Sequence, residues 1–270
     1  MKRRGCHHSQ GEKMRKLIMA IALLFTALMV HGCNKSMKYE PQDFFEGRQL
    51  DIAQLIYDGD EVKLKEQLPS ISKEELNRPV KADMTLLFWS VLNAIYDKNT
   101  PERLKIITDL VKAGADPLQP RPEGGSSPAE FVMKADKGIW IKAMLDGGLP
   151  PNAKDKVFNQ PIIFEALDAK NTETLKVMLD YGTDINKRDS LGNTLLISSL
   201  DSRSFDHTIL LLERGADSKI KGKFGWTMGN QLQRFIDRGV GDAEDKEKIN
   251  KIKGLLIKNG GDWPPLPVEN

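Results

Sequence analysis

One helix ending recurs along this chain at a fixed interval, and that interval limits the fold more than any other feature. The ending is an apolar helical run, then Gly, then Asp, as in Ile209–Asp217. Related endings occur at Ile107–Asp116, Leu175–Asp184 and Lys253–Asp262. The best-spaced glycines are Gly114, Gly148, Gly182 and Gly215. Each follows the one before it by about 33 residues, and such a period predicts an array of stacked repeats.

The chemistry of this ending is that of a helix terminus. Glycine closes a helix in the left-handed conformation, which costs a residue with a Cβ about 1–2 kcal/mol. The Asp that follows has a short acceptor side chain, which can hold a turn. We therefore expect each Gly to end a helix and each Asp to begin a loop.

A second landmark has the same period. The segments that begin new helices start at Ser127, Gln160, Thr194 and Thr227, again one repeat length apart. Ser127-Pro128-Ala129-Glu130 combines an N-cap, Pro at the first helical position and Glu at the third, the pattern of a capping box. Each unit is therefore predicted to contain a turn, a helix, a tight turn, a second helix and a Gly-ended loop.

These segments resemble the ankyrin repeat, which opens with Thr-Pro-Leu-His-x-Ala and ends with Leu-Leu-x-x-Gly-Ala-Asp. The resemblance covers roughly Leu50 to Asp262, and the endings are its most specific part. The openings depart from the pattern, because none has the family's His and only Pro128 and Pro161 match its Pro. The resemblance implies an all-α solenoid of about six helix-turn-helix units with finger turns, over residues 50–263. Residues 264–270 are expected to form a short tail.

The N-terminus has the pattern of a cleaved leader. Met14-Arg15-Lys16 precede the apolar stretch Leu17–Val30, which is too short to span a bilayer. The stretch ends Val30-His31-Gly32-Cys33, which resembles a bacterial lipobox with an unusual His at its second position. We therefore expect residues 1–32 to be a signal peptide and Cys33 to receive lipid. The alternative is an ordinary cleaved signal with a chance Cys, and translation starts at either Met1 or Met14.

The residues after Cys33 give the expected location. Residues 33–49 are polar and are predicted to form a lipidated tether. In the Gram-negative sorting pattern that this segment resembles, Asn34 implies the outer membrane, with the protein facing the periplasm. Lipid on Cys33 would then be the membrane contact.

The leader also accounts for the basic isoelectric point. It holds six of the 40 basic and one of the 38 acidic residues, so the remaining chain has a net charge of −3. That balance gives no reason to expect a nucleic-acid partner, which would require a clustered basic face.

Few residues suggest chemistry. His207 follows Asp206 near a helix start and has no nucleophile partner in the sequence, so we expect it on a polar helix face. Gly124-Gly125-Ser126-Ser127 precedes a helix but lacks the Gly-Lys-Ser/Thr of a P-loop. The carboxylates around Asp242 are expected in a solvated loop. No catalytic residue, metal ligand or cofactor is therefore predicted.

The predicted binding residues lie in the finger turns, where ankyrin arrays contact proteins. Trp89 and Trp140 fall at core positions of helices instead. Trp226 is open to two interpretations, an interface anchor or a residue packed under the last helix. The candidate protein-binding residues are Lys156, Phe158, Lys187, Arg188, Lys221, Lys223, Phe224 and Trp226.

The expected function is binding of another protein by a monomeric, lipid-anchored scaffold. The preferred hypothesis is an immunity protein that neutralises a toxin or lipase effector acting in the periplasm. The first alternative is an adaptor that organises resident envelope proteins. The second is an enzyme with an unrecognised site.

Overall fold

The computed structural model describes residues 38–96, 99–122 and 125–269. The expected signal peptide and the lipidation site at Cys33 lie outside these residues. Regular structure within the described ranges is helical, with no strand. None of the described helices is long and apolar enough to cross a membrane. The chain divides into two compact units, the first ending at Pro128 and also including Asp146–Gly148, and the second comprising Ala129–Leu145 and the residues from Leu149 onward.

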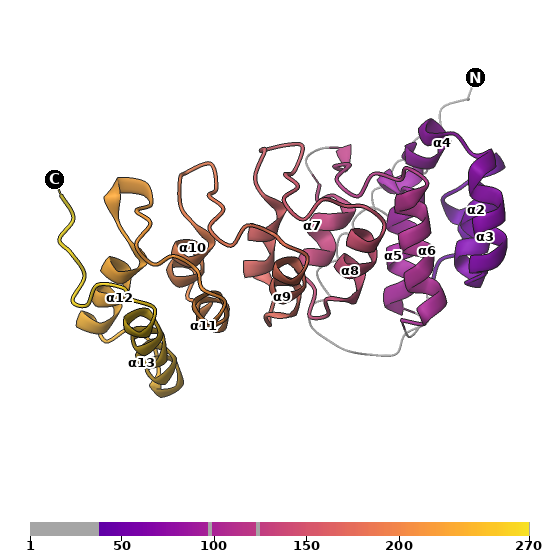
Figure 1. Cartoon of the computed structure of the whole chain (residues 1–270). Coiled ribbons are helices and arrows are strands. Elements are labelled where there is room, and N and C mark those ends of the chain that lie inside the picture. The colour runs from indigo at the N-terminus through magenta and orange to yellow at the C-terminus, as the bar shows by residue number, and fades with distance from the viewer. Residues whose placement is uncertain (1–37, 97–98, 123–124, 270) are drawn as a thin grey trace, which may run out of the picture. The chain divides into compact units, whose positions relative to one another are not determined.

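The first unit is built from two helical pairs and short connecting turns (Figure 1). Helix α2 packs against both α3 and α5, and α6 packs against α5 and α3. The helices are α2 (Gly47–Asp58), α3 (Glu61–Gln67), α4 (Lys73–Asn77), α5 (Leu86–Tyr96) and α6 (Pro101–Lys112). Short 3-10 turns lie at η1 (Pro41–Asp43), η2 (Leu68–Ser70) and η3 (Lys81–Asp83).

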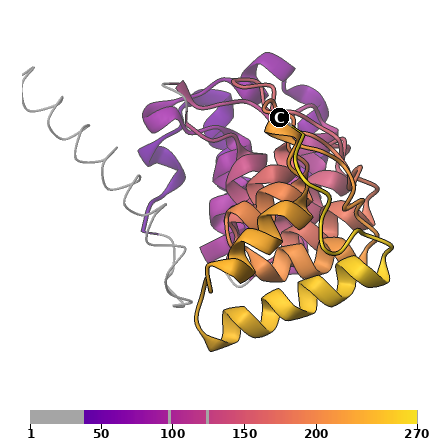
Figure 2. The ribbon, with the colours of Figure 1, turned by 90° about the vertical axis from the view of Figure 1, so that its left-hand side faces the viewer.

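The second unit stacks four further pairs. Helix α10 packs against α11 in its own pair and α12 in the next, while α11 packs against α13. Figure 2 shows α13 as the long last helix of this unit. The pairs are α7 (Pro128–Met133) with α8 (Ile139–Asp146), η5 (Ile162–Asp168) with α9 (Glu173–Asp180), α10 (Leu195–Asp201) with α11 (Phe205–Glu213), and α12 (Met228–Asp237) with α13 (Ala243–Lys258). The described residues thus contain the six helical pairs that the sequence predicts.

The glycine endings have the predicted geometry. Gly114, Gly148, Gly182 and Gly215 have φ values of 111°, 113°, 91° and 83°, all in the left-handed region. The aspartates after them hold turns, because Asp116, Asp184 and Asp217 each accept a hydrogen bond from the backbone N–H two residues later, at 2.9–3.0 Å. These contacts confirm the helix-end interpretation.

The helix starts also follow the sequence. The side chains of Asp60, Ser72, Thr100, Thr194 and Thr227 each accept a hydrogen bond from the backbone N–H three residues later. Such caps are typically worth about 1 kcal/mol each.

The folded part begins earlier than the sequence suggests. Phe44 and Phe45 are buried against Trp89, with ring centroids 5.6 and 5.9 Å from it. The indole Nε1 of Trp89 donates to the carbonyl of Ala53 at 3.0 Å. Gln49 is also buried, within α2, which begins at Gly47. The prediction of a tether through Gln49 is therefore wrong, because two aromatic rings of this segment complete the core around Trp89.

Two other elements differ from expectation. The first helix of the fourth pair is the 3-10 helix η5, which begins with the β-branched pair Ile162-Ile163, poor formers of α-helix. The insertion in the last pair, expected as a solvated loop, forms the start of α13. Asp242 is the N-cap of that helix, and its side chain accepts from the Asp245 N–H at 2.9 Å. Acidic residues there stabilise the helix N-terminus.

A pair of carboxyl groups lies between two helices of the first unit. Glu61 Oε1 on α3 and Asp109 Oδ2 on α6 are both shielded from solvent, and Lys105 Nζ lies 3.6 Å from Glu61 Oε1. Burial, followed by the hydrogen bond with Glu61, raises the pKa of Asp109. The same hydrogen bond lowers the pKa of Glu61. The protonated form of Asp109 is therefore favoured more in the folded state than in the unfolded chain.

The glycine endings predict opposite effects for two Gly→Ala substitutions. Both Gly215 and Gly254 have open space around an added Cβ, but only Gly215 has a positive φ, while Gly254 lies inside α13. Gly215→Ala should destabilise the fold by about 1 kcal/mol, and Gly254→Ala should stabilise it by about as much. Thermal unfolding should show shifts of roughly 2–4 °C in opposite directions. Equal shifts of the same sign would contradict this assignment.

The raised pKa of Asp109 predicts a pH dependence of stability. Because the pKa of Asp109 is raised in the folded state, protonation of Asp109 stabilises the fold. That contribution to stability is fully present below the unfolded-state pKa and is lost as pH rises through the folded-state pKa. Asp109→Asn keeps a donor for Glu61 and removes that loss, so the variant should gain melting temperature relative to the wild type as pH rises from 4 to 8. Asp51→Asn, at an exposed position on α2, is the matched control for the loss of one carboxylate. Parallel curves for Asp109→Asn and the wild type would contradict the raised pKa of Asp109.

Candidate protein-binding surface

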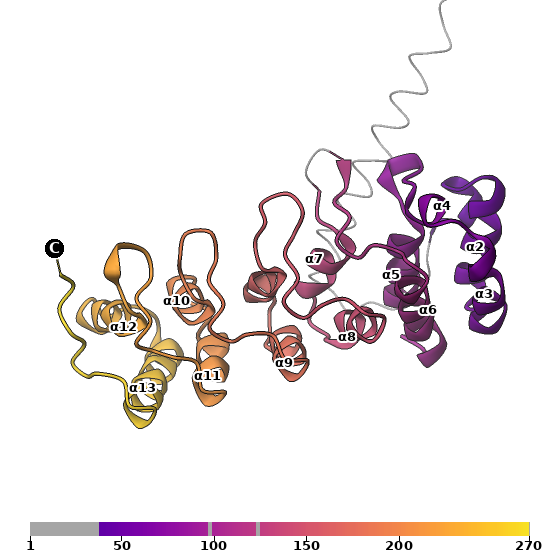
Figure 3. The same cartoon turned by 45° about the horizontal axis from the view of Figure 1, so that its top comes forward.

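Three loops of the second unit project on the same side, ahead of η5, α10 and α12 (Figure 3). We name them finger A (residues 150–161), finger B (184–194) and finger C (217–227). Each narrows through an antiparallel backbone contact: Lys154 with Pro161 in finger A, Arg188 with Thr194 in finger B, and the Gly222 N–H with the Trp226 carbonyl at 2.7 Å in finger C. The fingers are therefore folded hairpin-like loops with defined ends.

Carboxylates inside the fingers hold their shape. Asp155 accepts hydrogen bonds from the backbone N–H groups of Val157, Phe158 and Gln160 at 2.6–2.9 Å. Asp189 accepts from those of Leu191 and Asn193, both at 2.9 Å. These aspartates point into the loops, so they contribute structure.

Hydrogen bonds also connect each finger to the next. Near the bases, Asn152 Oδ1 accepts from the Asp184 N–H at 3.0 Å, and Asn186 Oδ1 accepts from the Asp217 N–H at 2.9 Å. The amide side chains that precede the next helices do the same farther out. Gln160 accepts from the Ser190 N–H at 3.0 Å and Asn193 from the Lys223 N–H at 2.8 Å. These contacts were not predicted from the sequence, although Asn and Gln recur there at the repeat spacing.

The finger ends expose large apolar side chains at equivalent positions. Phe158, Leu191 and Phe224 are 76%, 57% and 79% exposed. They recur once per repeat, at the same place in each finger. Both Phe residues were predicted from the sequence, whereas Leu191 was missed, and the repeat spacing would have identified it. We call these three side chains the tip row.

The backbone at Phe224 adds a cost without a packing benefit. Its φ is +61°, which costs a residue with a Cβ about 1–2 kcal/mol, and its ring lies in solvent beneath the Lys223 ammonium, 4.9 Å from Nζ to the ring centroid. Strained residues of this kind concentrate at functional sites. The ring of Phe224 therefore lies outside the buried core.

The predicted basic residues divide into exposed and structural groups. Lys156, Lys221 and Lys223 are exposed, whereas Lys187 is half-buried. Arg188 is exposed, and its guanidinium donates to the Lys221 carbonyl at 2.8 Å and to that of Gly192, so it connects fingers B and C. Trp226 is half-buried at the base of finger C, and the tip is formed by Phe224.

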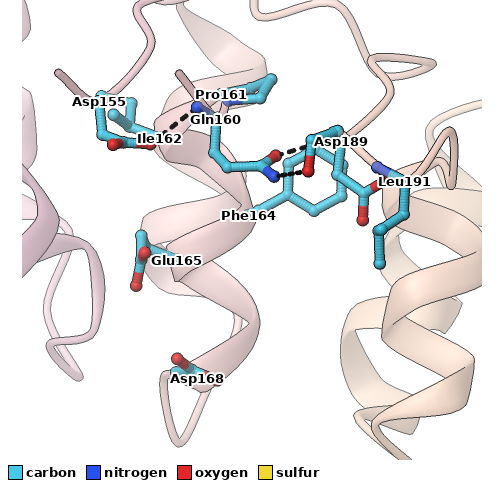
Figure 4. Close-up of a pocket in the computed structure, with 10 residues that line it drawn as sticks. Asp155, Gln160, Pro161, Ile162, Phe164, Glu165, Asp168, Asp189 and Leu191 are labelled. Atoms are coloured by element: carbon cyan, nitrogen blue, oxygen red, sulfur yellow. Dashed lines mark hydrogen bonds between the residues drawn. The ribbon is translucent and has the colours of Figure 1, made fainter. Parts of the chain in front are cut away.

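Beneath fingers A and B lies a hollow of about 340 Å³ (Figure 4). Its lining includes Phe164, Leu191 and four carboxylates, those of Asp155, Glu165, Asp168 and Asp189. Burial raises the pKa of Glu165, against the opposing effect of Lys134, whose Nζ lies 2.9 Å from Glu165 Oε2. The lining of the hollow therefore suits the cationic end of an Arg or Lys side chain better than an anion.

Other candidate sites have structural explanations. His207 is buried, so the expected polar helix face is wrong. Burial lowers its pKa, while the backbone of Ala166 and Asn171 in the preceding repeat acts in the opposite direction. Its place in the stack rather than at a surface explains the difference. Within the described ranges, no group of His, Cys, Asp or Glu could hold a metal ion.

The hydrogen bonds between fingers predict that loss of the Asn193 side chain loosens finger C alone. Asn193→Ala removes the acceptor for the Lys223 N–H, which should cost about 1 kcal/mol and open the end of finger C. Hydrogen–deuterium exchange at finger C should accelerate, while exchange at finger A should not change. Asn250→Ala, at an exposed position on α13, is the control. Unchanged exchange at finger C in the Asn193 variant would show that its amide does not hold the loop.

Comparisons with known proteins identify chains that are similar to this one. No protein-family model matches the chain. Ankyrin repeat and SOCS box protein 6 of Homo sapiens is 28% identical over 140 residues, which cover 47% of this chain, and the protein of that name from Pongo abelii matches equally. The chain spans about one third of the length of these curated relatives, 33% in each case.

Solved structures match over more of the chain. The ankyrin repeat domain of Bcl-3, a member of the IkappaB protein family, has a TM-score of 0.57 and 20% identity, covering 78% of this chain and 86% of that one. An ankyrin repeat domain from Acinetobacter baumannii has a TM-score of 0.53 and 18% identity, covering 78% and 98%. With the stacked helical pairs and fingers, these matches show that the chain has the ankyrin-repeat fold.

Proposed function

We propose that this chain is a lipid-anchored immunity protein of the bacterial envelope, which binds and neutralises a toxin or lipase effector acting in the periplasm. Binding rests on the fingers of the second unit, and the lipid on Cys33 holds the protein at the outer membrane. The protein acts by occupying a surface of the toxin and performs no chemistry of its own.

The tip row is the observation that carries this proposal. Three large apolar side chains stand in solvent at the same position of successive repeats, and one of them holds an unfavourable backbone conformation. None of these side chains is part of the buried core, whereas aromatic side chains are common anchors of protein interfaces. A binding surface is thus the simplest explanation for the tip row.

The leader supports the envelope location. Basic residues, a short apolar stretch and a Cys after Gly32 form the lipobox-like pattern, and Asn34 follows the Cys. A scaffold anchored there would meet effectors that reach the periplasm from neighbouring cells. The step from location to immunity is an argument from architecture, because a fold alone does not determine function.

Deletion of the gene tests this role in competition between sister cells. The deletion strain should be killed by wild-type neighbours, and re-expression of the full chain should restore its survival. A Cys33→Ser variant should lose labelling by radioactive fatty acid and should protect less well, because it no longer concentrates at the membrane.

The control is competition against an attacker whose effector secretion is disabled, in which all strains should survive equally. Equal survival of the deletion strain beside an active attacker would contradict immunity. Co-purification of resident envelope proteins in place of an effector would favour the adaptor function instead.

A further inference from the structure

The charges of the three fingers are arranged asymmetrically. The carboxylates of Asp155, Asp184, Asp189 and Asp217 each accept a backbone N–H, so they are directed to the loops themselves. The exposed finger lysines are Lys154, Lys156, Lys219, Lys221 and Lys223, while the exposed Arg188 donates to the backbone of fingers B and C. The finger ends therefore present an apolar row flanked by positive charge.

The repeat sets the spacing of that row. Packed helices of neighbouring repeats lie roughly 10 Å apart, so successive tips of equivalent loops are separated by about that distance. An α-helix rises 1.5 Å per residue, so about seven of its residues span the same length. Apolar residues at positions i, i+7 and i+14 of a helix would meet Phe158, Leu191 and Phe224 in register.

We propose that the tip row binds an acidic amphipathic helix of the partner protein. Its apolar residues recur every seven positions, and Asp or Glu side chains beside them pair with the finger lysines. This inference rests on the proposed function, because it names the surface that the bound protein presents. The acidic residues of such a helix would speed its association with the basic fingers, and the fingers would repel a basic helix.

A membrane is the competing explanation for exposed apolar and basic residues. The hollow beneath the fingers argues against it. Leu191 of the tip row also lines that hollow, together with the carboxylates of Asp155, Glu165 and Asp189. An anionic lipid surface drawn over finger B would meet these negative charges. A protein helix, by contrast, can place its acidic residues beside the finger lysines and away from the hollow, which a uniformly anionic surface cannot do.

Synthetic helical peptides test the proposal on the mature protein. The probe is an Ala-based peptide of about 18 residues with Leu at every seventh position and flanking Glu. Its counterpart has Lys in place of Glu. In fluorescence anisotropy, the acidic peptide should bind at least about tenfold more tightly than the basic one and weaken with added salt. A peptide with Leu at every fifth position should bind more weakly than the probe.

Single substitutions assign the binding to the tip row. Phe158→Ser, Leu191→Ser and Phe224→Ser should each weaken the acidic peptide severalfold. Val62→Ser on α3, 66% exposed and outside the fingers, should leave the affinity unchanged. Phe224→Gly should also weaken binding, while its melting temperature should be no lower than that of the wild type, because Gly accepts the positive φ. This pairing separates a loss of binding from a loss of folding.

Three results would overturn the proposal. They are equal affinity for acidic and basic peptides, unchanged affinity in the tip variants, and binding to phosphatidylglycerol vesicles that the tip variants abolish. The last would assign the tip row to lipid. Failure of the peptides in a protein that still protects cells in competition would reject this helix alone and leave the proposed function standing.

Discussion

The left-handed glycine at each helix end is the constraint on which the rest of this structure depends. Gly182 and Gly215 turn the chain out of one helical pair at a fixed interval, with φ values of 91° and 83°. Asp184 and Asp217 then begin the fingers by accepting backbone N–H groups. Because each turn has the same geometry, equivalent residues of successive fingers reach equivalent places. The regular spacing of the tip row follows from that repetition.

Local chemistry predicted the scaffold well because its determinants lie within a few residues of one another. Thr194 and Thr227 cap their helices, and the glycine period gives the number of repeats. Long-range contacts were not predictable in this way. Phe44 and Phe45 lie in a polar stretch, and only the distant Trp89 explains their burial. The insertion of the last pair was misread because charged residues suit a loop and a helix N-terminus equally.

The candidate surface was predicted in part for a similar reason. Phe158 and Phe224 were predicted because they lie in the expected finger turns, whereas Leu191 attracts attention only when the three fingers are compared. Arg188 was taken for a contact residue, and much of its hydrogen bonding is directed at the backbone of fingers B and C. Residue type alone does not separate a basic group that holds a loop from one that faces solvent.

The central claim is that function resides in the tip row and stability in the scaffold beneath it. Survival in sister-cell competition, measured with a Phe158→Ser, Leu191→Ser, Phe224→Ser triple variant of wild-type melting temperature, tests that claim most directly. The account predicts that cells carrying this variant at normal abundance are killed as readily as the deletion strain. Full protection by the triple variant would contradict it.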